Sequence, residues 1–126
     1  MLIRLHPCTA PDLALGADLA LHRADTRDAA QLWRYDLTGR LAPVGSPLVV
    51  TAVPGALELA LNPLSRNDPA QRWLLEPDLL RHPATGLVLR PEHFVPVPGS
   101  RVLLGTPTGT DTQCWHQHRV REPATA

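Results

Sequence analysis

The sequence of 126 residues predicts an all-β fold built from three similar units that close into a barrel. The main observation is that each of the three tryptophans follows a glutamine by two positions, although the chain has only four glutamines: Gln31 and Trp33, Gln71 and Trp73, Gln113 and Trp115. The tryptophans are 40 and 42 residues apart, which divides the chain into nearly equal units. Fourteen prolines along the chain leave no window for a long helix.

Within the units, apolar residues alternate with small or polar ones, as in the run from Leu57 through Leu59 to Leu61. This period of two is typical of strands, and four short strands per unit give about twelve. We expect the repeats at residues 1–38, 39–78 and 79–120, followed by a tail at 121–126. In the first unit the strands are expected near 2–5, 12–16, 19–23 and 31–36.

The second unit repeats this scheme near 40–44, 48–53, 56–61 and 71–76, and the third near 79–82, 87–91, 100–105 and 113–119. Three such units can form a pseudo-threefold barrel capped by three hairpins, which removes exposed strand edges. The last strand of each unit would carry Gln and Trp on one face, because side chains repeat every two residues. We expect the indole to fill the core and the glutamine amide to bond loop backbone groups.

Three Gln-x-Trp motifs at this spacing resemble the ricin B-chain type of β-trefoil lectin, whose hallmark is one such motif per repeat. The segment from Asp28 to Trp33 is similar to that family's loop before the motif, and the segment from Ala84 to Leu89 resembles its entry into the second strand of a repeat. The resemblance covers essentially the whole chain. It implies a β-trefoil fold and a non-catalytic, carbohydrate-binding protein without a cofactor or metal.

In that family a sugar pocket combines an Asp at the end of the second strand, an aromatic residue after the third and an Asn before the Gln. The Asp position falls here on Gly16, Thr51 and Arg90, to within about two residues in the first unit. The aromatic position falls on His22, Ala60 and Gly105, and the Asn position on Ala30, Ala70 and Thr112. No unit has the full set, so we expect divergent sugar sites.

The first unit offers His22, Arg23, Asp25 and Asp28 around Gln31 as candidate sugar ligands. His22 has a ring to stack on a sugar and nitrogens to hydrogen-bond one. The alternative interpretation is a solvated loop with a local Arg–Asp pair.

The second unit offers Asn62, Asn67 and Asp68, together with Ser65, and turn-forming side-chain bonds explain these residues equally well. In the third unit the candidates are Arg90, Phe94 and Asp111. Phe94 is the only phenylalanine, and three interpretations remain open for it: a stacking platform, a contact for a partner, or packing under its own loop.

Two cysteines, Cys8 and Cys114, are too few for a disulfide framework, so we expect free thiols in a reducing cytoplasm. A disulfide between them is the alternative if the chain ends lie side by side. Cys114 also begins a Cys-x-His-x-His string with His116 and His118. A soft metal ion could use such ligands, but an exposed polar strand face is the preferred interpretation.

Composition excludes several functions. Twelve basic and twelve acidic residues balance, which argues against a nucleic-acid partner, and no apolar run is long enough for membrane insertion. The N-terminus lacks a signal-peptide pattern, so we expect a cytoplasmic protein or release by another route. None of the serines lies in a Gly-x-Ser-x-Gly motif, and no enzyme is predicted. The alternative to a lectin is a β-trefoil scaffold for a protein partner or for self-association.

Overall fold

The computed structural model describes residues 1–121, and the predicted tail lies outside them except for Arg121. All twelve predicted strands are present. Unit one holds β1 (Leu2–Pro7), β2 (Leu13–Leu15), β3 (Leu21–Arg23) and β4 (Trp33–Tyr35). Unit two holds β5 (Leu41–Pro43), β6 (Leu48–Ala52), β7 (Leu59–Pro63) and β8 (Leu74–Leu75). Unit three holds β9 (Leu80–His82), β10 (Leu87–Pro91), β11 (Val102–Gly105) and β12 (Trp115–Val120).

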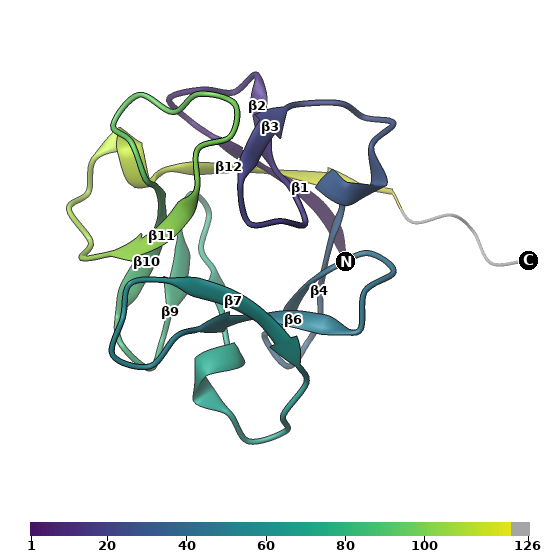
Figure 1. Ribbon diagram of the computed structural model, residues 1–126, viewed down its shortest axis with the longest axis vertical. Helices are drawn as coiled ribbons and strands as arrows, with labels where there is room; N and C mark the ends of the chain where they lie inside the picture. The colour runs from purple at the N-terminus through teal and green to yellow at the C-terminus, as the bar shows by residue number, and fades with distance from the viewer. Residues whose placement is uncertain (122–126) are drawn as a thin grey trace, which may run out of the picture.

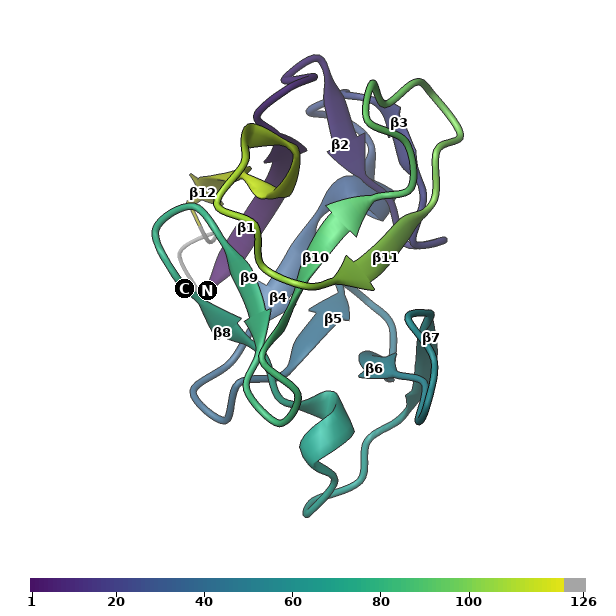
Figure 2. The same cartoon turned by 90° about the vertical axis from the view of Figure 1, so that its left-hand side faces the viewer.

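The strands form the predicted β-trefoil. The strands β12, β1, β4 and β5 lie side by side in that order, and β8 pairs with β9. Backbone bonds from Trp73 N to Gly39 O (2.7 Å) and from Trp115 N to Asp78 O (2.8 Å) join these groups into the barrel. The hairpins β2–β3, β10–β11 and β6–β7 lie around it (Figures 1 and 2). No helix in residues 1–121 has the length and apolarity needed to cross a membrane.

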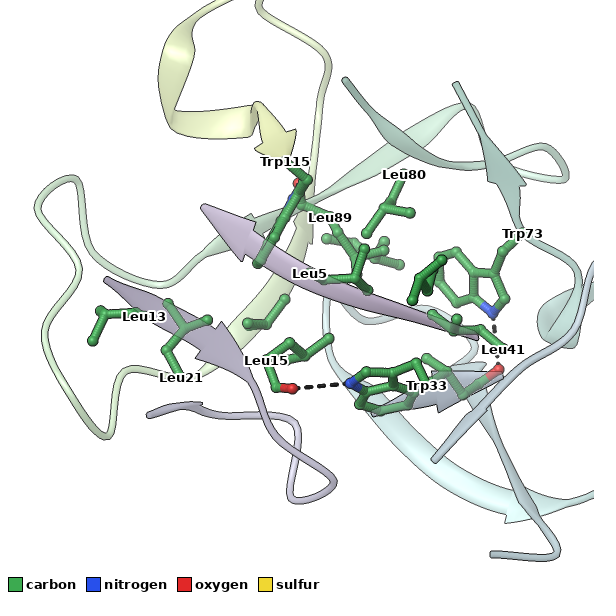
Figure 3. Close-up of a cluster of buried hydrophobic side chains, with 14 of the residues drawn as sticks. Leu5, Leu13, Leu15, Leu21, Trp33, Leu41, Trp73, Leu80, Leu89 and Trp115 are labelled. Carbon is green, nitrogen blue, oxygen red and sulfur yellow. Dashed lines mark hydrogen bonds between the residues drawn. The ribbon is translucent and has the colours of Figure 1, made fainter. Parts of the chain in front are cut away.

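The three tryptophans are the symmetric anchors of the core, as predicted. Their exposed fractions are 0%, 2% and 0%, and leucines from all three units pack around them (Figure 3). Each indole Nε1 donates to a carbonyl of the second strand of its own unit: Trp33 to Leu15 (2.9 Å), Trp73 to Val50 (2.9 Å) and Trp115 to Leu89 (3.0 Å). These bonds therefore define which positions are equivalent in the three units.

The glutamines do not lie on strands, and that prediction is wrong. Each one ends a short 3-10 turn before the tryptophan: η1 (Ala29–Gln31), η2 (Pro69–Gln71) and η3 (Asp111–Gln113). The predicted role of the amide is correct. Gln31 Oε1 accepts from Asp25 N (2.8 Å) while its Nε2 donates to Arg23 O (2.7 Å). The turn is needed because the amide must reach the loop backbone while the indole points into the barrel.

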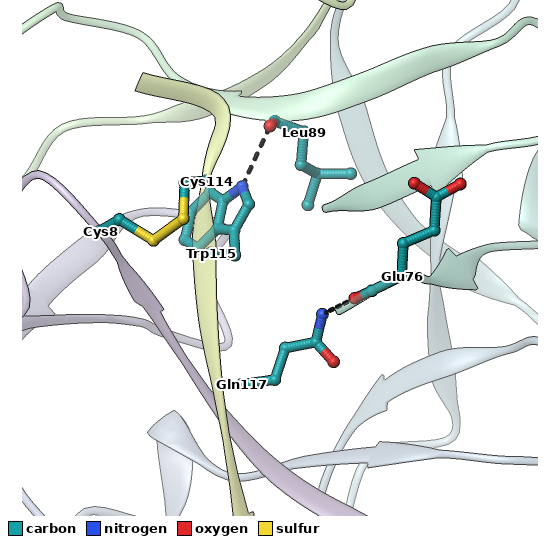
Figure 4. The surroundings of a disulfide bond; sticks show 6 residues. All are labelled: Cys8, Glu76, Leu89, Cys114, Trp115 and Gln117. Carbon is teal, nitrogen blue, oxygen red and sulfur yellow. Dashed lines mark hydrogen bonds between the residues drawn. A yellow bond between two sulfur atoms is a disulfide. The ribbon is translucent and has the colours of Figure 1, made fainter. Parts of the chain in front are cut away.

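Cys8 and Cys114 form a disulfide, so the expectation of free thiols is wrong (Figure 4). The cause is the pairing of the first and last strands, in which β1 and β12 align antiparallel from Leu2 opposite Val120 to Pro7 opposite Trp115. The next residue on β1 therefore meets the residue before β12, and Cys8 N donates to Cys114 O at 3.0 Å. The bond ties unit one to unit three across 106 residues of sequence.

Candidate functional site

Unit one contains a hollow of about 300 Å³ between the turn that joins β2 to β3 and the η1 turn. A backbone bond from Ala17 N to Ala30 O (2.7 Å) holds these two walls together. Larger grooves exist elsewhere, but this hollow gathers a carboxylate, an imidazole and a second carboxylate at one point. The residues that line it are Gly16, Ala17, Asp18, His22, Asp28, Ala30 and Gln31.

The central feature of the hollow is a pair formed by Asp18 and His22. The His22 Nε2 lies 2.9 Å from Asp18 Oδ1 and 2.8 Å from Asp18 Oδ2. The carboxylate also accepts a bond from Ala20 N at 3.2 Å. Both side chains are open to solvent, at 44% for His22 and 58% for Asp18. A ligand can thus reach both groups, while each holds the other in position.

The backbone around Gly16 makes this pair possible. A Cβ at Gly16 would lie 2.8 Å from His22 Cδ2, closer than real Cβ contacts, and 3.0 Å from Asp18 Oδ1, which is tighter than most. Glycine therefore leaves the space that the imidazole occupies. The turn closes through Leu19 N to Gly16 O (2.9 Å), and Leu19 adopts a left-handed φ of 62°. A leucine in that region is strained, and strained backbone of this kind is typical of functional sites.

Asp28 lines the hollow and also stabilises its wall. It is the N-cap of η1, and its Oδ1 accepts from Ala30 N at 2.9 Å. Asp68 makes the same bond to Ala70 N (2.9 Å) in unit two. Capping therefore accounts for the aspartate in both loops, whereas Asp18 has no equivalent carboxylate in unit two.

Arg23 and Asp25, the other candidates in unit one, do not line the hollow. Asp25 Oδ1 accepts from Arg27 N at 2.9 Å and so shapes the loop.

The equivalent place in unit two lacks the Asp18–His22 pair. Because Val50 pairs with Leu61 as Leu15 pairs with Leu21, the residue matching His22 is Asn62, and the alignment to Ala60 is wrong. Val53 stands where unit one has Asp18. A hollow of about 300 Å³ is present there too, but Asn62 is not in it. Its lining is mostly apolar, with Val53 and Pro54 among the residues, and its polar members are Asp68, His82 and Thr85.

In unit three the equivalent place is covered. Arg90 extends across Gly105, where an added Cβ would lie 2.7 Å from Arg90 Cδ. Glu92 stands in the place of Asp18, and its Oε2 accepts from Arg101 N at 3.3 Å. Phe94 is 80% exposed, so its packing under the loop is excluded. Asp111 opens the η3 turn and is exposed.

The histidines after Cys114 lie on the outer face of β12, and both are exposed. His116 is opposite His6, with the ring centroids 6.3 Å apart, and His118 is opposite Arg4. Cys114 is bonded to Cys8 and does not join them. Within residues 1–121, no three His, Cys, Asp or Glu side chains are placed to hold a metal ion.

Comparison with known proteins places this geometry in a recognised fold. The sequence matches no protein-family model and no curated protein. Its structure is similar to the C-half of an earthworm R-type lectin solved with GalNAc (TM-score 0.76, 13% identity, 93% of this chain and 97% of that one). It is also similar to the designed threefold-symmetric protein ThreeFoil (TM-score 0.77, 18% identity, 94% of this chain and 99% of that one). A third similar structure is the β-trefoil lectin of the Vibrio vulnificus hemolysin, solved with N-acetyl-D-lactosamine (TM-score 0.68, 18% identity, 96% of this chain and 97% of that one). These likenesses show the β-trefoil fold.

Asp18 is not among the predicted site residues, although the Asp position is placed on Gly16 only to within about two residues. The Asp18 carboxylate lies two residues after Gly16, and the tight turn at Leu19 directs it into the hollow. The available signal was an acidic residue directly after the strand end at Gly16 and four residues before His22.

Proposed function

We propose that this chain is a non-catalytic carbohydrate-binding protein that uses one principal site, the unit-one hollow. The observation that carries the proposal is the Asp18–His22 pair at the mouth of this hollow. A carboxylate accepts charge-assisted hydrogen bonds from two adjacent sugar hydroxyls, and the imidazole offers a flat face and a second polar atom. The β-trefoil fold shared with the lectins above supports the same function.

The chemistry of the hollow favours a neutral sugar. Asp18 and Asp28 supply acceptors and no arginine or lysine lines the walls, so hydroxyl donors suit the hollow better than an acidic group. The hollow is small, and Asp18 and His22 are exposed in it, which favours a terminal sugar over an extended chain. The disulfide between Cys8 and Cys114 favours an oxidising compartment over the cytoplasm expected from the N-terminus.

The test is a glycan array, followed by titration of isotope-labelled protein with the best neutral saccharide. We expect binding with amide shifts confined to the segments around Asp18 and Ala30. Asp18→Ala should weaken binding at least tenfold, since it removes the charged acceptor. Gly16→Ala should also weaken it, because the added methyl displaces His22 without deleting any polar group.

Glu92→Ala is the matched control, because Glu92 occupies the equivalent position in unit three. It should leave saccharide binding unchanged. An intact fold that binds no glycan on the array at high protein concentration would overturn the proposal. Binding that survives Asp18→Ala but is lost in a Phe94→Ala variant would move the site to unit three.

A protein-interaction scaffold is the second candidate, and one observation favours it. The loop between β10 and β11 exposes Phe94 (80%), Val95 (70%) and Val97 (53%) together. Apolar side chains gathered on one loop are typical of a contact surface. Concentration-dependent sedimentation that Phe94→Ser abolishes would support self-association through this loop.

A further inference from the structure

The junction of units one and two contains a groove of about 550 Å³ that shares no residue with the sugar hollow. It lies between the β4–β5 turn and the loop from β7 to η2. The residues that line it include three arginines, Arg40, Arg66 and Arg72, and one acidic residue, Asp36. We refer to it as the Arg40 groove.

Arg40 is the buried arginine of this groove, and hydrogen bonds to the neighbouring loop fix its side chain. The residue is 7% exposed, and both of its side-chain hydrogen bonds come from Nη2, to Ser65 O (3.1 Å) and Arg66 O (2.7 Å). Its Nε has no hydrogen-bond partner in the described part of the chain. The guanidinium donates to neutral carbonyls, and the charge of Asp36 also acts on it. A buried cation with an unused donor favours a further negative partner.

The carboxylate of Asp36 is occupied by its own turn. Its Oδ1 accepts from Thr38 N (2.9 Å), Thr38 Oγ1 (2.6 Å) and Arg40 N (3.0 Å). Burial acts to raise the pKa of Asp36, but these hydrogen bonds and the positive charge of Arg40 outweigh burial, and the pKa is lowered. Asp36 therefore stays charged and fixed in the turn. The three guanidinium groups outnumber it, and the groove keeps an excess of positive charge.

Arg66 and Arg72 are exposed at the rim. No ion pair in residues 1–121 involves either of them. A guanidinium presents planar donors that match the oxygens of a tetrahedral anion, and it binds such groups in a forked geometry. We propose that the Arg40 groove binds a sulfate or phosphate group, carried either as a free ion or as a substituent of a saccharide.

The test uses the whole chain, labelled with ¹⁵N and titrated with sodium sulfate while sodium chloride keeps the ionic strength constant. We expect saturable shifts of the Arg40 Nε–H signal and of the amides of residues 64–67. Arg66→Ala and Arg72→Ala should each weaken sulfate binding by about tenfold. Both residues are exposed, so both variants should fold.

Two variants serve as controls. Arg27→Ala removes an exposed arginine from the equivalent loop of unit one, and Asp18→Ala disables the sugar hollow; both should leave sulfate binding intact. The proposal is wrong if sulfate shifts every exposed arginine equally, or if Arg66→Ala and Arg72→Ala bind sulfate like the unaltered chain. Failure of saccharide binding in the hollow has no bearing on these results.

A second titration distinguishes the two sources of the anion. A sulfated disaccharide that binds at least tenfold more tightly than inorganic sulfate, while its desulfated form does not shift Arg40 Nε–H, identifies a saccharide substituent. Equal affinity for the disaccharide and the free ion identifies a free-anion site.

Discussion

Unit one and unit two build their polar loops from the same backbone contacts but present different chemistry on the outside. In both loops an aspartate caps the 3-10 turn, and a glutamine amide closes the loop: Asp28 with Gln31 in unit one, Asp68 with Gln71 in unit two. In both, an arginine from a neighbouring segment donates to loop carbonyls. Arg4 does so in unit one, and Arg40 in unit two.

The two arginines differ in how many hydrogen bonds their guanidinium groups donate to the loop. Arg4 donates to three carbonyls, those of Asp25, Thr26 and Asp28, whereas Arg40 reaches two and leaves Nε unbonded. The surroundings also differ, because unit one places acidic Asp18 beside its loop, whereas unit two has Arg66 in its loop and Arg72 directly after the η2 turn. Contacts to backbone atoms keep the loop shape, and the outward side chains are left free to vary in charge.

The largest test of this equivalence is removal of the core anchors. Trp33→Ala and Trp73→Ala should each lower the free energy of unfolding by about 3–5 kcal/mol, because each deletes a buried indole and its bond to a strand carbonyl. Urea unfolding measures both. Leu37, which is fully exposed, is the control, and Leu37→Ala should change little. A loss for Trp73 far below that for Trp33 would show that the units are not energetically equivalent.

A second test concerns the covalent bond, which holds unit one and has no counterpart in unit two. The Cys8→Ser and Cys114→Ser double variant should lose about 2–5 kcal/mol of unfolding free energy, since the bond closes a loop of 106 residues. Thiol titration of the unaltered chain under denaturing conditions, without reductant, should find no free thiol. Two reactive thiols per chain would contradict the disulfide and restore the expectation of a reduced pair.

The fold could be predicted from the sequence because one physical requirement recurs three times. An indole must reach the core while an amide two residues earlier closes a loop, and Gln31 with Trp33 shows that spacing in the sequence itself. The site could be predicted only in part. His22 and Asp28 were predicted beside Gln31, and both line the hollow. Asp18 reaches the hollow through a turn in which Leu19 has a positive φ, and sequence alone gives no reason to expect a leucine there.

The remaining features depend on contacts distant in sequence. Cys8 and Cys114 meet because β1 pairs with β12, which only barrel closure establishes. The Arg40 groove combines a turn near Asp36 with a loop near Arg66, and neither segment carries a motif. Such juxtapositions need the packed structure.

The third prediction addresses the two arginines directly. Arg4→Met should lower the free energy of unfolding by about 2–3 kcal/mol, because three loop carbonyls lose a charged donor. Arg40→Met should cost about 1 kcal/mol, since it loses two bonds but also removes a buried cation with an unbonded Nε. Both residues are 7% exposed, so methionine fills comparable space at the two sites. Equal losses in urea unfolding would contradict the difference inferred between the loops.

The smallest expected effect is a dependence of the unfolding free energy on pH that arises from His6 in unit one. Unit two has Ala42 at the equivalent strand position and therefore lacks this contribution. Burial is the main cause that lowers the pKa of His6 below 6.5; the bond to Leu13 O opposes it, and the charges of His116, His118 and Arg4 add to the lowering. His6 is thus neutral in the folded chain at a pH where the unfolded chain already binds a proton.

Stability should therefore be fully present above pH 6.5 and decline as the pH falls from 6.5 through the lower pKa of the folded state. Unfolding free energies measured between about pH 7.5 and pH 5 will show this slope as one component, and His6→Gln should reduce it. His118→Gln should reduce it less, because it removes only one of the repelling charges. An unchanged slope in His6→Gln would mean that the acid sensitivity of the barrel arises elsewhere and does not distinguish unit one from unit two.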